Sequence, residues 1–204
     1  MIKTLIFDFG DVFINLDKVK PYQEMEKLGI RSFSEEMLQT NILYETGKIS
    51  SEEFLAFYQN KFPAISAKEL ETAWNSIILD FPEYRLEFIE KLTALKKHKL
   101  ILLSNTNDLH IEKVIENMTL ERFQRFQKCF DAFYLSQEIH LRKPNADIYE
   151  FVLAKHQIQA EECLFIDDTS ENTEIAKKLG IHTWNIKPKT EGIINLFKIH
   201  SELF

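Results

Sequence analysis

The chain has 204 residues, of which 45% are hydrophobic and 28% charged, and its formal net charge is −7. This length and composition suit one domain, or a core with an inserted subdomain, and can fill a packed core. The acidic balance, without any basic stripe, argues against a nucleic-acid or anionic-membrane surface.

The first predicted element is a short apolar run, Thr4–Phe7, which ends on Asp8 and is followed by Gly10 and Asp11. A continuous apolar run of this length predicts a buried strand of a parallel sheet. Its carboxyl end lies at the edge where open α/β sheets bind ligands. Taken alone, Asp8 is either a turn-forming aspartate beside glycine or a carboxylate nucleophile or metal ligand.

No strand pattern follows until about residue 80, and the intervening stretch predicts four helices. The first begins near Pro21 and stops at Gly29, and the second has Ser34 as N-cap and ends at Gly47. The third and fourth begin with the capping-box pairs Ser50/Glu53 and Ser66/Glu69. Residues 80–82 lead the chain back to the core.

The remainder alternates between helix and strand. The pattern predicts helices over 83–97, 108–118, a piece through 126, 145–156, 171–179 and 191–199, with strands over 100–103, 131–135, 163–166 and 181–186. Such alternation predicts an α/β fold, a Rossmann-like parallel sheet with helices on both faces.

Two domains are therefore expected. Residues 1–15 and 83–204 form the α/β core, and residues 16–82 form an inserted α-helical cap. An insert that leaves from the carboxyl edge of the sheet and returns to it must lie over that edge. A cap in this place closes a site and excludes water.

Polar residues follow several of the predicted strands: Asp8, then Ser104-Asn105, Lys143, and Asp167-Asp168. Singly, Ser104-Asn105 suits a helix cap and Lys143 an ordinary loop. An acidic pair after a buried strand is harder to dismiss, because unpaired like charges are costly there. In a parallel sheet all these positions converge on one crevice.

The order Asp8, Ser104, Lys143-Pro144 and Asp167-Asp168, with a helical insert after the first motif, resembles the haloacid dehalogenase superfamily. The resemblance covers essentially the whole chain. The stretches 7–12, 103–109, 135–149 and 165–180 most resemble the branch that contains sugar-phosphate phosphatases such as glucose-1-phosphate phosphatase.

The resemblance implies a catalytic set of Asp8, Ser104, Asn105 and Lys143. Asp8 would attack phosphorus and form an aspartyl phosphate. Ser104, beside Asn105, would bind a phosphoryl oxygen, and Lys143 would neutralise phosphoryl charge and restrain Asp8. A small phosphorylated molecule is the expected substrate.

The implied metal is Mg²⁺, a hard cation that prefers oxygen ligands. Its ligands would be Asp8, the Gly10 carbonyl oxygen, Asp168 and, with it, Asp167. The sequence leaves open which aspartate of the pair contacts the metal.

One departure from the family pattern concerns the general acid. Phosphatases of the superfamily usually carry a second aspartate two residues after the nucleophile, and this chain has Gly10 there. Three explanations are open. A water molecule or a cap residue can supply the proton to the leaving alcohol, or Asp11 can take the place of the missing aspartate. Alternatively, the protein is not a competent phosphatase. General acid–base catalysis typically accelerates a reaction by about 10²–10⁴-fold.

Three functions follow from these observations. The first is a Mg²⁺-dependent phosphatase acting on a small, sugar-type phosphomonoester. The second is a dehalogenase acting on carbon, against which Asp167-Asp168 argues. The third is a catalytically degenerate protein that binds a phosphorylated ligand or a partner, with Gly10 as its mark.

The remaining expectations concern the cell. Cys129 and Cys163 match no metal spacing, and Cys163, inside an apolar strand, is expected as a buried free thiol. The N-terminus enters a strand directly and does not resemble a secretory signal, and no apolar run approaches the roughly 20 residues of a bilayer span. We expect a cytoplasmic monomer or homodimer without nucleic-acid or membrane partners.

Overall fold

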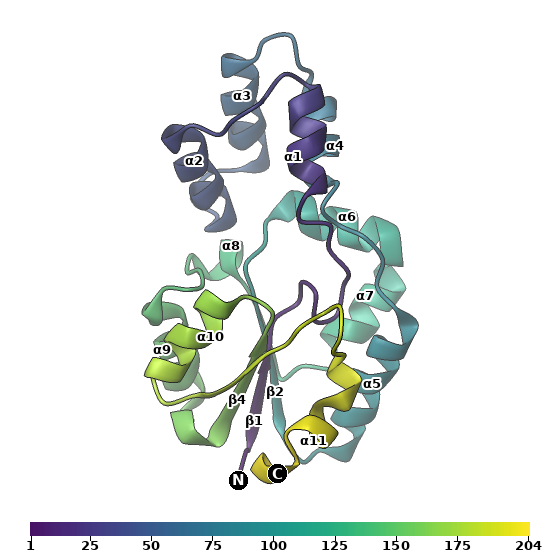
Figure 1. Ribbon diagram of the computed structural model, residues 1–204, viewed down its shortest axis with the longest axis vertical. Helices are drawn as coiled ribbons and strands as arrows, with labels where there is room; N and C mark the ends of the chain where they lie inside the picture. The colour runs from purple at the N-terminus through teal and green to yellow at the C-terminus, as the bar shows by residue number, and fades with distance from the viewer.

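The computed structural model describes residues 1–204 and places five parallel strands at the centre of the chain (Figure 1). The strands are β1 (Thr4–Phe7), β2 (Lys99–Ser104), β3 (Ala132–Leu135), β4 (Cys163–Asp167) and β5 (His182–Asn185). Their order in the sheet is β3-β2-β1-β4-β5. The predicted parallel sheet is confirmed, with strand ends within about one residue of those expected.

The sheet register brings the carboxyl ends of the strands to one edge. Phe7 of β1 is opposite Leu102 of β2 and Ile166 of β4, so Asp8 follows directly beside the ends of both neighbours. β1 is buried along its whole length, as is β4. Both strands are therefore held from two faces, and the residues that follow them have fixed positions.

Helices cover both faces of the sheet, on the left and the right in Figure 1. One face packs against α5 (Glu83–Leu95), α6 (Asp108–Met118), α7 (Leu120–Gln127) and α11 (Leu196–Ile199). The other packs against α9 (Ala146–His156) and α10 (Ser170–Lys178). Phe126 of α7 is fully buried and contacts Phe9, Phe13 and Phe130, with ring centroids 4.9 to 5.1 Å apart, so phenylalanine side chains fill much of this core.

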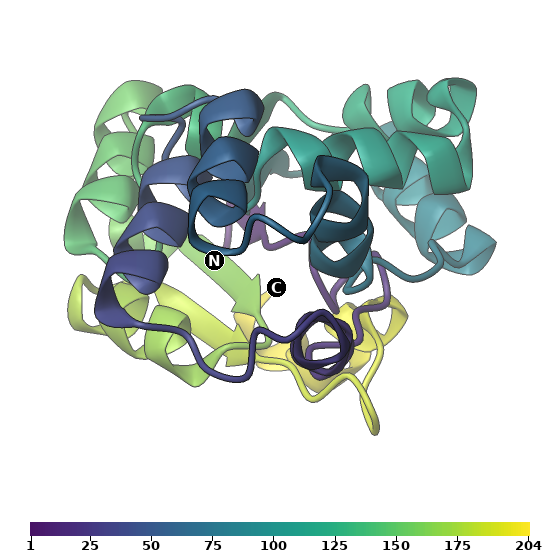
Figure 2. The same ribbon diagram turned by 90° about the horizontal axis from the view of Figure 1, so that it is seen from above.

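Four further helices stand together at one end of the molecule, at the top of Figure 1. They are α1 (Lys20–Lys27), α2 (Glu35–Glu45), α3 (Ser51–Lys61) and α4 (Ala67–Asn75), and they share a hydrophobic core of their own. The Ser34 cap and both predicted capping boxes are present. Seen from above in Figure 2, these helices lie over the carboxyl edge of the sheet.

The chain enters and leaves this helical group along one pair of segments. Leu16 and Ile78 form an antiparallel bridge, and hydrogen bonds join Asn15 to Leu79 and Asp80. The two connections therefore run side by side.

One predicted helix is wrong. Residues 191–199 form a 3₁₀ turn, Ile193–Asn195, and only then the short α11. The Glu191 carboxylate instead accepts hydrogen bonds from Trp184 Nε1 at 3.1 Å and Lys187 N at 2.8 Å, and Gly192 is extended. These bonds fix a turn before the helix can begin. A four-residue helix, α8 (Ser136–Ile139), was not expected.

Both cysteines are buried free thiols, which confirms the prediction for Cys163. None of the helices is both long enough and apolar enough to cross a membrane.

Candidate active site

A buried lysine joins two aspartates at the carboxyl edge of the sheet. Lys143 Nζ lies 2.7 Å from Asp8 Oδ1 and 2.6 Å from Asp167 Oδ2. The side chains of Lys143 and Asp167 are 1% and 0% exposed, whereas that of Asp8 is 12% exposed, so the network is accessible at Asp8. Such a network is stable only because each charge has a partner. The structure therefore brings together three of the residues expected from the sequence.

Burial and charge act against each other at this network. Burial raises the pKa of Asp8 to about 7, although Lys143 beside it favours the ionised carboxylate. Burial alone would lower the pKa of Lys143, but the charges of Asp167 and Asp8 outweigh burial and raise it. Lys143 therefore remains an ammonium ion, and additional positive charge at this edge would lower the pKa of Asp8.

The two adjacent acids have different surroundings. Asp167 accepts from Lys143 and Asn172 on Oδ2 and from Thr169 N on Oδ1, so both of its oxygens are engaged. Asp168 is only partly buried and pairs with Lys18. Asp168 therefore has the oxygen that is more accessible to a ligand.

The carboxylates fit a hard cation. One oxygen each of Asp8, Asp167 and Asp168 lies within 4.8 Å of the others. Oxygen-only donors at this spacing suit Mg²⁺, which takes one or two carboxylates and keeps several waters. The donor set is thus compatible with the metal that the sequence predicts.

Asn105 holds the main chain of Lys143. Its Nδ2 donates to the Lys143 carbonyl oxygen at 2.8 Å, and its Oδ1 accepts from Lys143 N at 2.9 Å. Both ends of the amide are used. Asn105 therefore lies at the site expected for it, but its side chain positions the lysine.

Ser104 ends β2 and is buried, and its Oγ makes one weak contact, 3.4 Å from the Asn105 carbonyl oxygen. The hydroxyl is therefore free to bind a ligand. Helix α6 begins further on, at Asp108, with Asn107 as its N-cap, so its first turn is not directly at Ser104.

Leu16 occupies the space beside Gly10. A Cβ on Gly10 would lie 2.6 Å from Leu16 Cδ1 and 3.9 Å from Asp8 Oδ2. A side chain at position 10 would need Leu16 to move. Asp11 turns away through a left-handed backbone with φ of 55°, accepts from Leu16 N at 3.0 Å and pairs with Lys18 at 3.1 Å.

Three adjoining cavities run from Asp8 into the helical group. The aspartate cavity, about 310 Å³, is lined by Asp8, Lys143 and Asp168 among others. The floor cavity, about 130 Å³, shares Gly10, Leu16 and Asn105 with it. The upper cavity, about 340 Å³, shares Glu45, Ile77 and His110 with the floor cavity.

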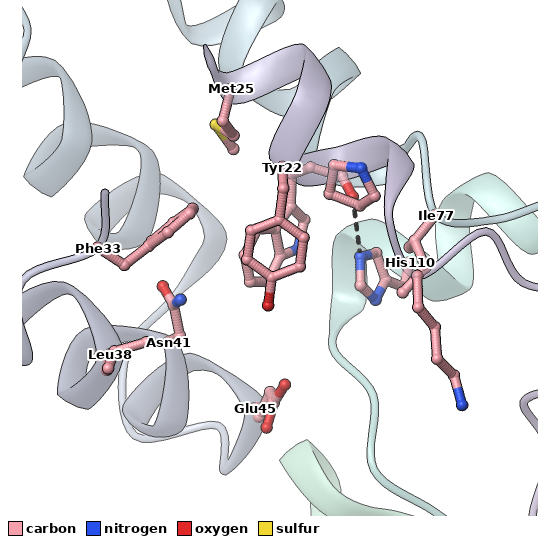
Figure 3. A pocket seen from close by; sticks show the side chains of 11 residues that line it. Tyr22, Met25, Phe33, Leu38, Asn41, Glu45, Ile77 and His110 are labelled. Atoms are coloured by element: carbon pink, nitrogen blue, oxygen red, sulfur yellow. Dashed lines mark hydrogen bonds between the residues drawn. The ribbon is translucent and has the colours of Figure 1, made fainter. Parts of the chain in front are cut away.

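The upper cavity is largely apolar (Figure 3). Tyr22, Met25, Phe33, Leu38, Trp74 and Ile77 line it together with Asn41, Glu45, His110 and Lys18. Lys18 is its one cationic side chain and is already paired with Asp168 and Asp11. The cavity therefore suits an uncharged molecule with hydroxyl groups better than an anionic one.

One loop of the helical group is attached to the core. Ser136 Oγ donates to the Glu45 carbonyl oxygen at 2.6 Å, and His140 Nδ1 lies 2.8 Å from the Thr46 carbonyl oxygen. Gly47 is so close to α8 that an added Cβ would lie 2.0 Å from the Gln137 carbonyl oxygen. This contact fixes the position of Glu45.

Glu45, Arg142, His110 and Lys18 were not predicted as site residues. Lys48, in the loop that follows α2, is exposed and lines none of the three cavities. No local motif marks Glu45 or Arg142, whose side chains pair at 3.0 Å only in the folded chain.

Comparison with known proteins shows the family to which a chain with this site belongs. A family model described as haloacid dehalogenase-like hydrolase matches residues 2–180. A D-ribitol-5-phosphate phosphatase of Bacteroides thetaiotaomicron is 30% identical over 190 residues, which are 90% of this chain and 91% of that protein.

Two solved structures are similar along nearly the whole chain. One is a haloacid dehalogenase family enzyme of Bacteroides thetaiotaomicron in complex with magnesium and inorganic phosphate, with a TM-score of 0.82, 33% identity, and coverage of 97% of this chain and 100% of that one. The other is a predicted haloacid dehalogenase (HAD)-like family hydrolase of Porphyromonas gingivalis, with a TM-score of 0.81, 27% identity, and 98% of both chains covered. The chain belongs to the haloacid dehalogenase-like hydrolase family.

Proposed function

We propose that this protein is a Mg²⁺-dependent phosphatase that hydrolyses a small, sugar-type phosphomonoester through an aspartyl phosphate. The observation that carries the proposal is the buried lysine shared by Asp8 and Asp167, with an oxygen of Asp168 within 4.8 Å of oxygens of both aspartates. The phosphatase and the magnesium–phosphate complex among its relatives support it.

Asp8 is the nucleophile in this proposal. It is 9% exposed and lines the aspartate cavity, so an incoming phosphoryl group can reach it. A carboxylate must be ionised to attack, and Lys143 at 2.7 Å favours that state. Lys143 also neutralises charge on the phosphoryl oxygens.

Mg²⁺ would be held by Asp8, Asp168 and the Gly10 carbonyl oxygen. When bound, it supplies the positive charge that offsets the phosphoryl oxygens and the neighbouring carboxylates. Asp167 keeps Lys143 in place and is not a direct ligand of the metal in this proposal. Ser104 offers its free hydroxyl to a phosphoryl oxygen, and Asn105 orients Lys143 through its main chain.

Residues 16–82 serve as the cap in this proposal, and residues 1–15 with 83–204 as the catalytic core. The paired connections at Leu16 and Ile78 form the hinge. Closing the cap over Asp8 excludes water, which strengthens the electrostatic interactions inside.

The leaving group occupies the upper cavity. Its walls are mainly apolar and aromatic, and two of its polar side chains, Asn41 and Glu45, suit hydroxyl groups. A neutral sugar or polyol is therefore favoured over a leaving group with a second phosphate or a carboxylate.

A panel of phosphomonoesters tests the proposal, assayed by phosphate release with Mg²⁺ and with a chelator. We expect Mg²⁺-dependent turnover of polyol and sugar monophosphates, and no turnover by Asp8→Asn. Asp11→Asn is the matched control, because Asp11 lines none of the cavities; we expect it to keep activity within a few-fold. Undiminished activity of Asp8→Asn, or turnover that survives the chelator, would contradict the proposal.

A further inference from the structure

The site lacks an obvious group to protonate the leaving oxygen. Position 10 has no side chain, and Leu16 fills the adjoining space. The floor cavity connects the vicinity of Asp8 to the upper cavity and is lined by two titratable side chains, Glu45 and His110. The proton donor is therefore expected from one of these two.

His110 is fully engaged. Its Nε2 lies 3.3 Å from the Trp74 carbonyl oxygen, which can only accept, so Nε2 carries the hydrogen. Its Nδ1 then accepts from Asn107 Nδ2 at 3.1 Å. Burial lowers the pKa of His110 to about 4, consistent with a neutral, structural imidazole.

Glu45 has a carboxylate oxygen without a hydrogen-bond partner and lines both the floor cavity and the upper cavity. Its Oε2 accepts from Arg142 Nη2 at 3.0 Å, which is the one hydrogen bond of this side chain, so Oε1 is left for a ligand. Figure 3 shows Glu45 at the end of α2, below the hydroxyl of Tyr22 and across the cavity from His110. Burial raises the pKa of Glu45 against the opposing effect of Arg142.

The Glu45 backbone is anchored to the core, although α2 belongs to the helical group. Ser136 binds the Glu45 carbonyl oxygen, and the following Thr46 and Gly47 contact His140 and Gln137. Arg142 immediately precedes Lys143, so the segment that positions the lysine also orients the glutamate. Such a fixed placement suits a group that must meet a reacting oxygen.

We propose that Glu45 is the general acid and base of this hydrolase, in place of the side chain that Gly10 lacks. The proposal rests on the phosphatase function above. Asp8 attacks phosphorus, the bond from phosphorus to the leaving oxygen breaks, and the proton of Glu45 passes to that oxygen. Water then attacks the aspartyl phosphate, Glu45 takes a proton from this water, and the phosphorus–Asp8 bond breaks to release phosphate.

The test compares Glu45→Gln with wild type on two substrates in the presence of Mg²⁺. One is a polyol phosphate that wild type hydrolyses, whose leaving oxygen needs a proton. The other is p-nitrophenyl phosphate, whose leaving group departs as a stable anion. Phosphate and nitrophenolate are followed by quenched and stopped flow.

We expect Glu45→Gln to lose about 10²–10⁴ in kcat on the polyol phosphate, without a burst. On p-nitrophenyl phosphate we expect one equivalent of nitrophenolate per enzyme in a fast burst, followed by slow turnover, because the aspartyl phosphate forms but lacks its base. Glu45→Asp, one methylene shorter, should recover part of the activity on both substrates.

Two results would overturn the assignment. An equal loss on both substrates without a burst would show that Glu45 only positions the cap. A raised KM for the polyol phosphate with unchanged kcat would show that it only binds a substrate hydroxyl. Thermal melting verifies that each variant is folded, and Lys48→Ala, an exposed residue of the same loop, should match wild type.

Failure of this inference is distinguishable from failure of the proposed function. Asp8→Asn should abolish both the burst and the turnover whatever the role of Glu45. If wild type and Glu45→Gln behave alike while Asp8→Asn is inactive, the phosphatase assignment stands and Glu45 is not the acid.

Discussion

The contact of Gly47 with α8 gives a sharp test of how the helical group is attached to the core. Gly47 has φ of +62°, and an alanine Cβ would lie 2.0 Å from the Gln137 carbonyl oxygen. The left-handed backbone costs an L-residue about 1–2 kcal/mol. Relieving the contact requires the loop to move away, since the obstacle is main chain.

Moving the loop would break the hydrogen bonds of Ser136 to Glu45 and His140 to Thr46, at 2.6 and 2.8 Å. Each is worth about 1 kcal/mol. We therefore expect Gly47→Ala to lower the free energy of unfolding by about 3–4 kcal/mol, the sum of the backbone cost and two hydrogen bonds. Because Glu45 moves with the loop, kcat/KM should fall by about 10²-fold.

Gly29→Ala is the matched control. Gly29 also has a positive φ, +91°, but an added Cβ would meet nothing within 4 Å. It should lose only the backbone cost of about 1–2 kcal/mol and keep its activity. The assays are urea unfolding and kcat/KM on a polyol phosphate. Equal losses of stability and equal activities in the two variants would refute the argument that this loop is tightly seated.

Three further outcomes test the site. Lys143→Met leaves Asp8 and Asp167 buried without their cation and should lower the free energy of unfolding in urea by about 3–5 kcal/mol at neutral pH. This loss should become smaller in acid, because the carboxylates take up protons. A loss that does not change with pH would argue against the network. Asp168→Asn should abolish the rise in melting temperature caused by Mg²⁺, whereas Asp167→Asn should retain it; the reverse pattern would exchange their roles. His110, with its pKa lowered from 6.5 to about 4, should reduce stability as pH falls through that window, because the unfolded chain takes the proton first. At about 1.4 kcal/mol per pH unit, the loss of unfolding free energy between these two pH values is roughly 3 kcal/mol. His110→Gln should remove this pH-dependent loss, and the same slope of unfolding free energy against pH in His110→Gln and in wild type would contradict the assignment.

Much of the fold follows from local patterns. The Ser50/Glu53 and Ser66/Glu69 capping boxes form as expected, because their bonds join residues three apart. The strands follow from continuous apolar runs, and the polar residues after them meet at one edge because all strands are parallel. The convergence of Asp8 and Lys143, 135 positions apart, was therefore predictable from topology.

The residues that the sequence did not reveal depend on packing. Glu45 and Arg142 are 97 positions apart and belong to different parts of the chain. Nothing in either local pattern indicates that the loop after α2 rests on α8. Likewise, the space beside Gly10 is filled by Leu16, whose position follows from the turn at Asp11 with its positive φ. Packing also explains why the helix predicted over residues 191–199 begins only at Leu196. The Glu191 side chain forms a hydrogen bond with Trp184, which the local sequence does not indicate.

The most direct test of the central claim is to identify the residue that carries phosphate during turnover. The enzyme is mixed with a phosphomonoester and Mg²⁺, quenched in acid during turnover, reduced with borohydride and digested for peptide mass spectrometry. We expect homoserine at position 8 in place of aspartate, and none in the control without substrate. Phosphate release with no modification of Asp8, or with modification of another carboxylate, would contradict the account.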